Sequence, residues 1–409
     1  MSLIRCLHIT NAKEASYQME EIGLDPTDLR SIQEKTLHIN LKVGKIDPRT
    51  ANLLRQEMLS FGGDAVVGRE GFHCSAKWTD TILMGDQNQF EKLTNQLEQN
   101  TNLQPLGQSL KETLKNISKT HYILRCRKQT LTLGKRTLLM GVLNVTPDSF
   151  SDGGLYYDRE KAIAQGLRMV EEEADILDIG GESTKPGSKP IELDEELRRV
   201  IPVIESLAQK VNVPISIDTY KSTVAKEAIQ AGAQIINDIS GLHFDPSLAN
   251  FAAKEDVPII LMHIRGTPET MQKNVHYDSL FSEILQYLKE SIQRAESAGL
   301  DPNQIIVDPG IGFGKTLEDN LLIIKNLFEF RILGKPILLG TSRKSFIGKI
   351  LNADVSERLE GTLSSIAIGV LNGAHIIRCH DVAQAKKAIV VADAIRLAGI
   401  SGSEIFAMT

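Results

Sequence analysis

LLMGVLN, residues 138–144, is the first of eight short apolar runs that each end on polar residues and precede a helix-like stretch. The other seven are DILDIGGES (175–183), VPISIDT (213–219), QIINDIS (234–240), VPIILMH (257–263), QIIVDPG (304–310), PILLGTSRK (336–344) and HIIRCHD (375–381). Continuous apolar runs are typical of strands buried on both faces, as in parallel sheets. Eight of them alternating with helices predict an α/β fold, a (β/α)8 TIM barrel.

Polar side chains gather at the predicted C-terminal ends of these strands. In a TIM barrel the loops at those ends build the active site. The residues there are Asn144, Asp178, Asp218, Asn237, His263, Asp308, Lys344, Arg378 and His380. So many polar groups at one end of one barrel indicate a catalytic site.

The bulk composition limits the possible partners and location. The chain has 409 residues, of which 42% are hydrophobic and 24% charged, with a net charge of −6. It gives no reason to expect nucleic acid or a membrane surface as the main partner. The four cysteines lack metal-ligand spacing, which favours reduced thiols. The N-terminal segment has no secretory pattern, and no apolar stretch approaches the ~20 residues of a membrane span. We therefore expect a cytoplasmic protein.

A barrel of about 250 residues leaves a substantial remainder before it. Residues 1–100 predict a small two-layer α/β domain of unknown role, with strands at 3–9 and 36–43 and a helix near 12–22. Asp47 and Pro48 are typical of an N-cap and first helical residue, and Gly62-Gly63 of the end of that helix.

The polar segment 101–120 predicts a helical connector, and 121–409 the barrel domain. The barrel domain begins with a predicted hairpin, residues 121–136, whose turn lies near 127–129. We expect this hairpin to cap the bottom of the barrel.

Two predicted strand-end loops are long. NVTPDSFSDGG (144–154) is rich in turn residues, and it exceeds the usual 2–6 residues of a βα connection, which favours a lid. GGESTKPGSKP (180–190) has glycines that permit close approach to a ligand, and Ser183, Thr184 and Lys185 are donors for an anionic group. For Lys185 alone, an ordinary solvated surface lysine is an equal alternative.

Asp218, Asn237 and Asp308 occupy equivalent strand-end positions. A carboxylate there must find donors or stay hydrated, because burying it unpaired is expensive. Adjacent N–H groups of an aminopyrimidinone ring are suitable donors, and an amide both donates and accepts. A helix N-cap is the alternative role for any one of them, but three equivalent positions favour ligand contact.

Cationic groups follow the seventh and eighth strands, where barrels commonly bind phosphate. Lys344 ends the Ser342-Arg343-Lys344 segment, and Arg378 and His380 alternate so that both face the same side of their strand. Arg offers a bidentate fork to phosphate, although a buried ion pair is the alternative for Arg378. The DPGIGFGKT segment (308–316) lacks the first glycine of a P-loop, which argues against a nucleoside triphosphatase.

With these motifs in their observed order, the chain resembles the dihydropteroate synthase family over about residues 122–400. The matching segments are MGVLNVTPDSFSDGG, DIGGESTKPG, ISIDTYK, NDISG, LMHIRGTPETMQ, DPGIGFGKT, GTSRKSFIG and RCHDV. The resemblance implies a transferase of folate biosynthesis that joins 6-hydroxymethyl-7,8-dihydropterin diphosphate to p-aminobenzoate. It also implies Mg2+ as cofactor and a homodimer formed through barrel helices.

The resemblance further implies a role for individual residues. Catalytic roles fall on Arg378, His380, Lys344 and Asp218; pterin binding on Asp218, Asn237, Asp308 and Lys344; diphosphate binding on Asn144, Arg378 and His380; p-aminobenzoate binding on Thr184, Pro186, Phe313 and Ser342; and the metal on Asn144. The family usually has Arg where this chain has Lys185, so a bidentate contact there becomes a single point charge.

Two other functions are alternatives to dihydropteroate synthesis. A methyltetrahydrofolate:corrinoid methyltransferase has a similar pterin-binding barrel but no diphosphate to hold, and no cobalamin motif is present. A non-catalytic pterin-binding protein, with residues 1–100 as an interaction module, would be expected to lose some of the strand-end residues. A truncation starting near Lys119 tests whether the N-terminal domain serves assembly or regulation.

Overall fold

The structure is a computed structural model that describes residues 4–7, 9, 11–25, 35–146 and 155–398. The chain forms two compact units, Met1–Ser118 with Leu397–Thr409, and Lys119–Arg396.

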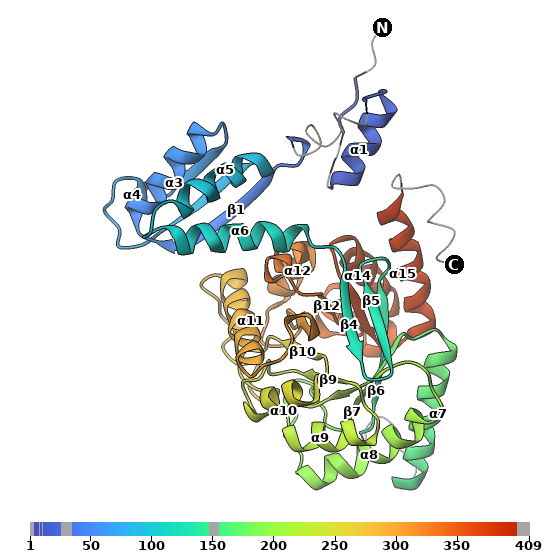
Figure 1. Cartoon of the computed structure of the whole chain (residues 1–409). Helices are drawn as coiled ribbons and strands as arrows, with labels where there is room; N and C mark the ends of the chain where they lie inside the picture. Colours follow the sequence, from blue (N-terminus) through green and yellow to red (C-terminus); the bar gives the residue numbers. More distant parts are fainter. Residues whose placement is uncertain (1–3, 8, 10, 26–34, 147–154, 399–409) are drawn as a thin grey trace. The chain divides into compact units, whose positions relative to one another are not determined.

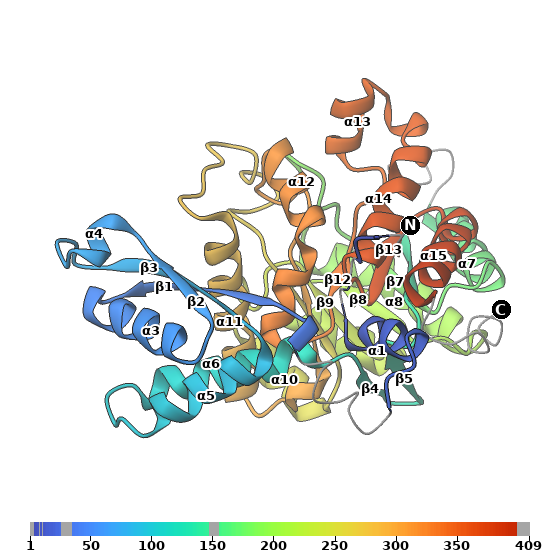
Figure 2. The ribbon, with the colours of Figure 1, turned by 90° about the horizontal axis from the view of Figure 1, so that it is seen from above.

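The first unit is built around a three-stranded antiparallel sheet with the order β1-β3-β2. Its elements are α1 (Ala12–Glu21), β1 (Ile39–Ile46), α3 (Pro48–Ser60), β2 (Asp64–Val67), α4 (Arg69–Phe72), β3 (Thr79–Gly85), α5 (Gln87–Glu98) and α6 (Gln104–Ser118). Leu54 and Met58 of α3 pack with Leu83 of β3 and Phe90 of α5, so helices cover one face of the sheet (Figure 2). This arrangement confirms the predicted two-layer α/β architecture.

Some local sequence signals in this unit match the structure and others do not. Asp47 caps α3 as predicted, because its side chain accepts from the backbone N–H groups of Arg49 and Thr50 at 3.1 and 3.0 Å. The strand predicted at residues 3–9 is wrong over the part that the structure describes, since residues 4–7 and 9 are not in a strand. The next strand begins at Ile39 and extends to Ile46, later than predicted. Helix α6, in the predicted connector, packs Leu110 into the core of this unit.

The second unit is the predicted TIM barrel (Figure 1). Its parallel strands are β6 (Leu138–Asn144), β7 (Ile176–Gly180), β8 (Ile215–Asp218), β9 (Ile235–Asp238), β10 (Ile259–Met262), β11 (Ile305–Asp308), β12 (Leu338–Leu339) and β13 (Ile376–Cys379). They follow one another around the sheet in chain order, with β13 beside β6. A parallel bridge between Val307 of β11 and Ile337, the residue directly before β12, closes the barrel.

Helices surround the strands, and their apolar faces pack on the outward strand residues. They are α7 (Leu155–Glu171), α8 (Leu193–Ala208), α9 (Ser222–Ala231), α10 (Ser247–Glu255), α11 (Leu280–Ser297), α12 (Leu317–Lys325), α13 (Ser345–Leu351), α14 (Leu359–Leu371) and α15 (Val382–Leu397), with 3-10 turns η2 (Pro302–Gln304), η3 (Leu327–Leu333) and η4 (Val355–Glu357). Outward residues such as Leu177 and Ile217 join the helices in the largest apolar cluster. Helix α7 starts at Leu155, directly after the segment 144–154 that was predicted as a loop.

The hairpin before the barrel consists of β4 (Tyr122–Cys126) and β5 (Gln129–Leu133), as predicted. Leu124 and Leu133 cluster with Met140, Ile260 and other residues from the first half of the barrel strands. These inward residues lie at the N-terminal end of the barrel. The hairpin therefore caps the bottom, and the opposite end stays open for a site.

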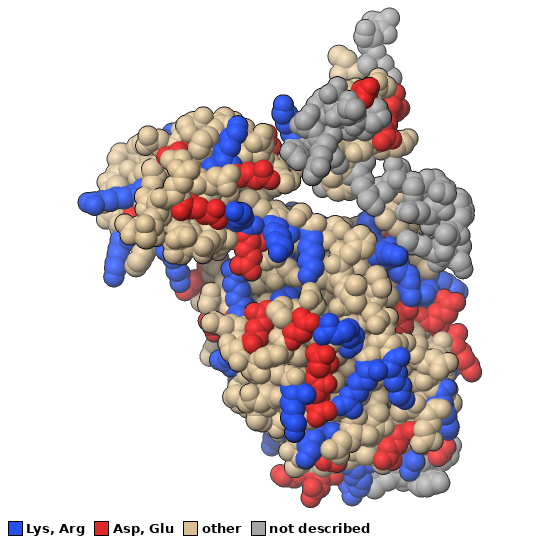
Figure 3. Space-filling model, in the orientation of Figure 1, with Lys and Arg blue, Asp and Glu red and all other residues tan. Residues whose placement is uncertain are grey.

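Charge is mixed on the face shown in Figure 3, where Lys and Arg alternate with Asp and Glu over the barrel unit. This distribution fits the net charge of −6. Among the described residues no helix is long and apolar enough to span a membrane.

Candidate active site

Strand register brings acidic and amide side chains together inside the C-terminal end of the barrel. Asp178 of β7 lies opposite Ser216 of β8, and Asp218 lies opposite Asn237 of β9. Successive side chains alternate between the two faces of a strand, so these residues point inward while their neighbours pack against helices. The apolar lower layer of the barrel interior thus gives way to a polar layer at the mouth.

Arg378 of β13 connects this polar layer across the barrel. Its Nε donates to Asp178 Oδ2 and its Nη2 to Asp218 Oδ2, both at 2.6 Å. Asn237 Nδ2 donates to the same Asp178 oxygen at 3.0 Å. Burial lowers the pKa of Arg378, but the two carboxylates outweigh that effect and the net shift is upward. Arg378 is therefore a permanent cation at the centre of the site.

The two carboxylates are not equivalent. The Asp178 side chain is fully buried, whereas the Asp218 side chain is 9% exposed at the mouth. Burial raises the pKa of Asp218 and Arg378 opposes the rise, while the nearby charge of Asp178 adds to it. Asp218 is thus a carboxylate that a ligand with N–H donors can reach and stabilise.

Asp308 and Lys344 form the other side of the mouth. Asp308 Oδ1 accepts from the backbone N–H of Gly310 at 2.7 Å. Lys344 donates to the carbonyl of Ile311, and its Nζ lies 4.8 Å from the centre of the Phe313 ring. Burial lowers the pKa of Lys344 to about 8, against the attraction of Asp308.

A buried lysine and a buried histidine contact each other beside the glycine-rich 308–316 segment. Lys315 Nζ is 2.8 Å from His263 Nδ1, and it donates to the Phe313 carbonyl at 3.1 Å. Burial lowers the pKa of Lys315 to about 7 and holds that of His263 well below its usual range. A neutral His263 is the acceptor in this pair. The contact ties the glycine-rich 308–316 segment to the end of β10.

His380 and Ser342 meet at the ends of the last two strands. Ser342 Oγ lies 3.0 Å from His380 Nδ1 and accepts from the His380 backbone N–H at 3.2 Å. Burial, reinforced by Arg378, lowers the pKa of His380 to about 4. His380 is therefore a neutral imidazole near pH 7. The neighbouring Arg343 is paired with Asp381, with its Nε 2.9 Å from Oδ2.

The two predicted long loops differ in how much the structure describes. Asn144 ends β6 opposite Gly180, but residues 147–154 of the predicted lid lie outside the described residues. The second loop is described throughout: Thr184 is half-buried, and Lys185 and Pro186 are exposed. Its tip is attached by a 2.9 Å hydrogen bond from the Gly187 N–H to the Pro268 carbonyl.

The barrel thus brings most of the residues predicted for the site to one end, on β6, β8, β9, β11 and β13 and on the loops that follow β7, β11 and β12. Direct contacts join Arg378 to Asp218, and Ser342 to His380. Two inward groups were given no role in advance. Asp178 Oδ1 and Ser216 Oγ are buried without a hydrogen-bond partner among the described residues. Asp178 had a signal, since it ends an apolar run like Asp218; the serine had none.

Metal binding by protein ligands alone is not supported in the described part of the chain, where no three His, Cys, Asp or Glu side chains are grouped suitably. Mg2+ commonly takes only one or two protein ligands and completes its shell with phosphate oxygens and water. The amide oxygen of Asn144 at the mouth fits such a shared site.

Comparison with known proteins agrees with this geometry. The pterin binding enzyme family matches residues 140–380. The dihydropteroate synthase of Synechocystis sp. is 49% identical over 263 residues, which cover 64% of this chain and 91% of that protein. The structure of the Xanthomonas albilineans dihydropteroate synthase with 4-aminobenzoic acid superposes with a TM-score of 0.64 at 42% identity, covering 68% of this chain and 99% of that one.

A third relative extends into the first unit. A probable bifunctional folylpolyglutamate synthase/dihydropteroate synthase of Halobacterium salinarum is 36% identical over 393 residues. The alignment covers 95% of this chain and 46% of that protein.

The chain belongs to the pterin-binding enzyme family. Its function is dihydropteroate synthesis, a transferase reaction of folate biosynthesis. The predicted fold class and activity are confirmed, and an additional N-terminal region precedes the catalytic barrel.

Proposed function

We propose that the polar layer at the barrel mouth binds 6-hydroxymethyl-7,8-dihydropterin diphosphate and p-aminobenzoate and joins them to 7,8-dihydropteroate. The observation that carries this proposal is the inward alignment of Asp218, Asn237 and Asp308 on three parallel strands, with Lys344 beside them. A flat ring with several N–H donors and acceptors needs acceptors and donors of this kind at its edge.

The pterin ring is assigned to Asp218, Asn237, Asp308 and Lys344. The carboxylates of Asp218 and Asp308 accept ring and exocyclic N–H groups, and Lys344 donates to ring acceptors. Asp308 already receives the Gly310 N–H on Oδ1, which fixes its orientation and leaves Oδ2 for the ligand. Arg378 Nη2 donates to Asp218 Oδ2, which likewise fixes the orientation of that carboxylate.

The diphosphate is assigned to Arg378, His380 and Asn144. Arg378 gives its Nε and Nη2 to carboxylates, and for Nη1 no partner is found among the described residues, so that nitrogen is available to a phosphate oxygen. The neutral His380 donates from its imidazole N–H without adding charge. A preorganised cation aimed at a departing diphosphate stabilises the transition state more than the ground state.

Mg2+ would be held by Asn144 together with the diphosphate oxygens. The mouth has three carboxylates, Asp178, Asp218 and Asp308, which more than offset the two positive charges of Arg378 and Lys344. Such a mouth attracts a polyanion weakly, which favours a substrate that arrives with a divalent cation. When bound, the cation would neutralise charge on the leaving diphosphate.

The p-aminobenzoate is assigned to Thr184, Pro186, Phe313 and Ser342. Phe313 offers an aromatic wall, which is held near Lys344 by a cation–π contact. Thr184 and Ser342 contribute hydroxyl groups for the carboxylate of the substrate. Lys185, where related enzymes usually have Arg, then contributes charge without a bidentate fork.

The residues support a stepwise substitution. The bond from the exocyclic carbon to the diphosphate oxygen breaks first, and its electron pair leaves with the diphosphate. The electron-rich pterin stabilises the resulting cation, and the p-aminobenzoate nitrogen then forms the new bond and loses a proton. The described long loop that follows β7 would help to keep water from trapping the cation.

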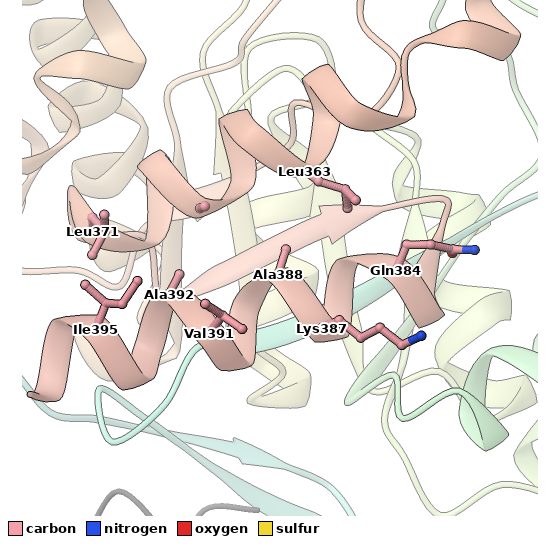
Figure 4. Close-up of a pocket in the computed structure, with 9 residues that line it drawn as sticks. Leu363, Leu371, Gln384, Lys387, Ala388, Val391, Ala392 and Ile395 are labelled. Atoms are coloured by element: carbon pink, nitrogen blue, oxygen red, sulfur yellow. The ribbon is translucent and has the colours of Figure 1, made fainter.

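We also propose that the enzyme is a homodimer formed through α14 and α15. Figure 4 shows an apolar groove between these helices, lined by Leu363, Leu371, Ala388, Val391 and Ile395. Val391 and Ile395 are each 60% exposed. An exposed apolar helix pair suits a twofold interface in which the same patch meets itself. A dimer in sedimentation experiments that Val391→Glu converts to a monomer would support it; an unchanged mass would exclude this face.

A cytoplasmic location completes the proposal. All four cysteines are free, including the exposed Cys6 and Cys74, which is typical of proteins in a reducing compartment.

The reaction itself is tested by diphosphate release from purified protein given the dihydropterin diphosphate and Mg2+, with and without p-aminobenzoate. Release that depends on p-aminobenzoate and yields dihydropteroate is expected. Asp218→Asn should weaken pterin binding, whereas Asp245→Asn, in the loop after β9, should not. Tight pterin binding without release would exclude the proposed chemistry at this mouth.

A further inference from the structure

A buried charge cluster lies beside the mouth and is not used by the proposed reaction. Lys221 Nζ donates to Glu182 Oε2 at 2.8 Å and to Glu196 Oε2 at 2.7 Å. The side chains of Lys221, Glu182 and Glu196 are 18%, 6% and 1% exposed. The three come from different places: the loop after β7, the first turn of α8, and the loop after β8.

The third acceptor of Lys221 shows that the cluster joins the two ends of a loop. Lys221 Nζ also donates to the Ile191 carbonyl at 2.7 Å. Glu182 stands at the start of the second long loop and Ile191 at its end, and the Ile191 N–H donates to Glu182 Oε2 at 3.1 Å. One ammonium group therefore joins the two ends of residues 183–190. All three of its hydrogens are used.

Neighbouring residues orient the two carboxylates. Tyr220 donates its hydroxyl hydrogen to Glu182 Oε1 at 3.0 Å, and Thr219 donates to Glu196 Oε1 at 2.7 Å. Three consecutive residues after β8 thus hold the base of the loop that follows β7. By contrast, the loop tip is exposed, and the hydrogen bond found there to another loop in the described part of the chain is the Gly187–Pro268 backbone contact.

Because of the charge balance, the closed position of the 183–190 loop depends on Lys221. With the lysine present, one cation faces two buried carboxylates. Without it, two carboxylates would remain close together and poorly hydrated, which is strongly unfavourable. Moving Glu182 toward water relieves that cost, and Glu182 belongs to the loop. Loss of the lysine should therefore open the loop instead of unfolding the barrel.

We propose that Lys221 is a positioning residue that closes the base of the 183–190 loop and so presents Thr184 and Pro186 to p-aminobenzoate. The loop-closing role stands on the contacts above. The substrate part rests on the proposed function, which assigns those two residues to p-aminobenzoate.

The test compares Lys221→Met with Lys335→Met in the full-length enzyme. Lys335 is a matched control because its buried Nζ donates to Glu296 Oε1 and to the Pro302 carbonyl, both at 2.8 Å, before β12 at the other end of the barrel. Amide hydrogen exchange is followed in the peptide covering 183–191. We expect about tenfold faster exchange there in Lys221→Met and no local change in Lys335→Met.

Kinetics then tests the substrate part. The KM for p-aminobenzoate should rise about tenfold in Lys221→Met, while the KM for the pterin substrate stays within about twofold. Lys221→Arg, which keeps the charge and can reach both carboxylates, should restore most of the loop protection. If Lys221→Met does not fold, Tyr220→Phe replaces it, because it removes only one bond to Glu182.

Unchanged exchange at 183–191 in the folded variant would overturn the loop-closing role. An equal rise of both KM values, or the same pattern in Lys335→Met, would overturn the positioning role. Faster exchange with an unchanged KM for p-aminobenzoate would support the loop-closing role and overturn the assignment of Thr184 and Pro186.

Discussion

Arg378 Nε lies 2.6 Å from Asp178 Oδ2, and this ion pair lies inside the barrel at the level of the site. The Asp178 side chain has no exposed surface, and its other oxygen has no partner among the described residues. An isolated buried carboxylate is costly, so Arg378 serves the fold as well as the substrate. The two alternatives considered for Arg378, ion pair and phosphate ligand, are therefore compatible.

Replacing Arg378 should separate these two roles. Arg378→Ala leaves Asp178 uncompensated and should lower the free energy of unfolding by about 3–5 kcal/mol and turnover at least about a hundredfold. Arg378→Ala combined with Asp178→Asn should regain most of the stability but not the turnover. Urea unfolding and steady-state kinetics measure both. Wild-type affinity for diphosphate in the double variant would contradict the assigned phosphate contact.

Glycine is required at position 310. Gly310 has a φ of +72°, and an added Cβ would lie 2.0 Å from the His263 carbonyl oxygen. Gly310→Ala should displace the turn that orients Asp308, with a loss of about 2 kcal/mol or more in stability and a raised KM for the pterin substrate. Gly299→Ala is the control, since its φ is +97° but nothing lies within 4 Å of an added Cβ. Its cost should stay near 1–2 kcal/mol, about the cost of the backbone conformation alone. Equal kinetics for the two variants would argue against the turn.

The barrel and most of the mouth could be predicted because they follow from short-range patterns. Buried parallel strands need continuous apolar runs, and the strand-end rule places Asp218, Asn237 and Asp308 at one end of the barrel. The strand predicted at residues 3–9 was wrong over its described part because an apolar segment becomes a strand only when it finds a partner. The sheet of that unit is completed by β1, β3 and β2.

Contacts between loops could not be predicted in the same way. Lys221 follows a strand by three residues, and nothing in ISIDTYK shows that its ammonium reaches back to Glu182 and Ile191. The Lys315–His263 pair likewise depends on how two loops pack. Such pairings follow from the three-dimensional course of the chain, which periodicity does not report.

The hairpin cap should contribute stability without touching the reaction. Leu124 is fully buried against the lower layer of the barrel, whereas Ile123 on the same strand is 58% exposed. Leu124→Ala should cost about 2–5 kcal/mol and Ile123→Ala about 0.5 kcal/mol or less. Chemical denaturation gives both values, and both KM values should stay at wild type. A kinetic defect in Leu124→Ala would show that the cap shapes the mouth from below.

Acid sensitivity should depend on His375 at the bottom of the barrel. This side chain is 7% exposed, and its Nδ1 accepts from the Ile337 backbone N–H at 3.1 Å, which requires the neutral imidazole. Burial, with smaller contributions from Arg331 and Arg396, lowers the pKa of His375 to about 3. The unfolded chain takes up this proton near its ordinary pKa of about 6.5, but the folded chain does not.

The contribution of His375 to the free energy of unfolding is therefore fully present above about pH 6.5. It is lost as the pH falls toward about 3, by up to about 1.4 kcal/mol per pH unit. His375→Asn keeps an acceptor for Ile337 and removes the titration, so its free energy of unfolding should fall less steeply between about pH 6 and pH 4. Urea unfolding across that range measures the slope. His276→Asn, at an exposed position, should keep the wild-type slope. Identical slopes for His375→Asn and the wild type would mean that the buried imidazole accepts its proton in the folded barrel.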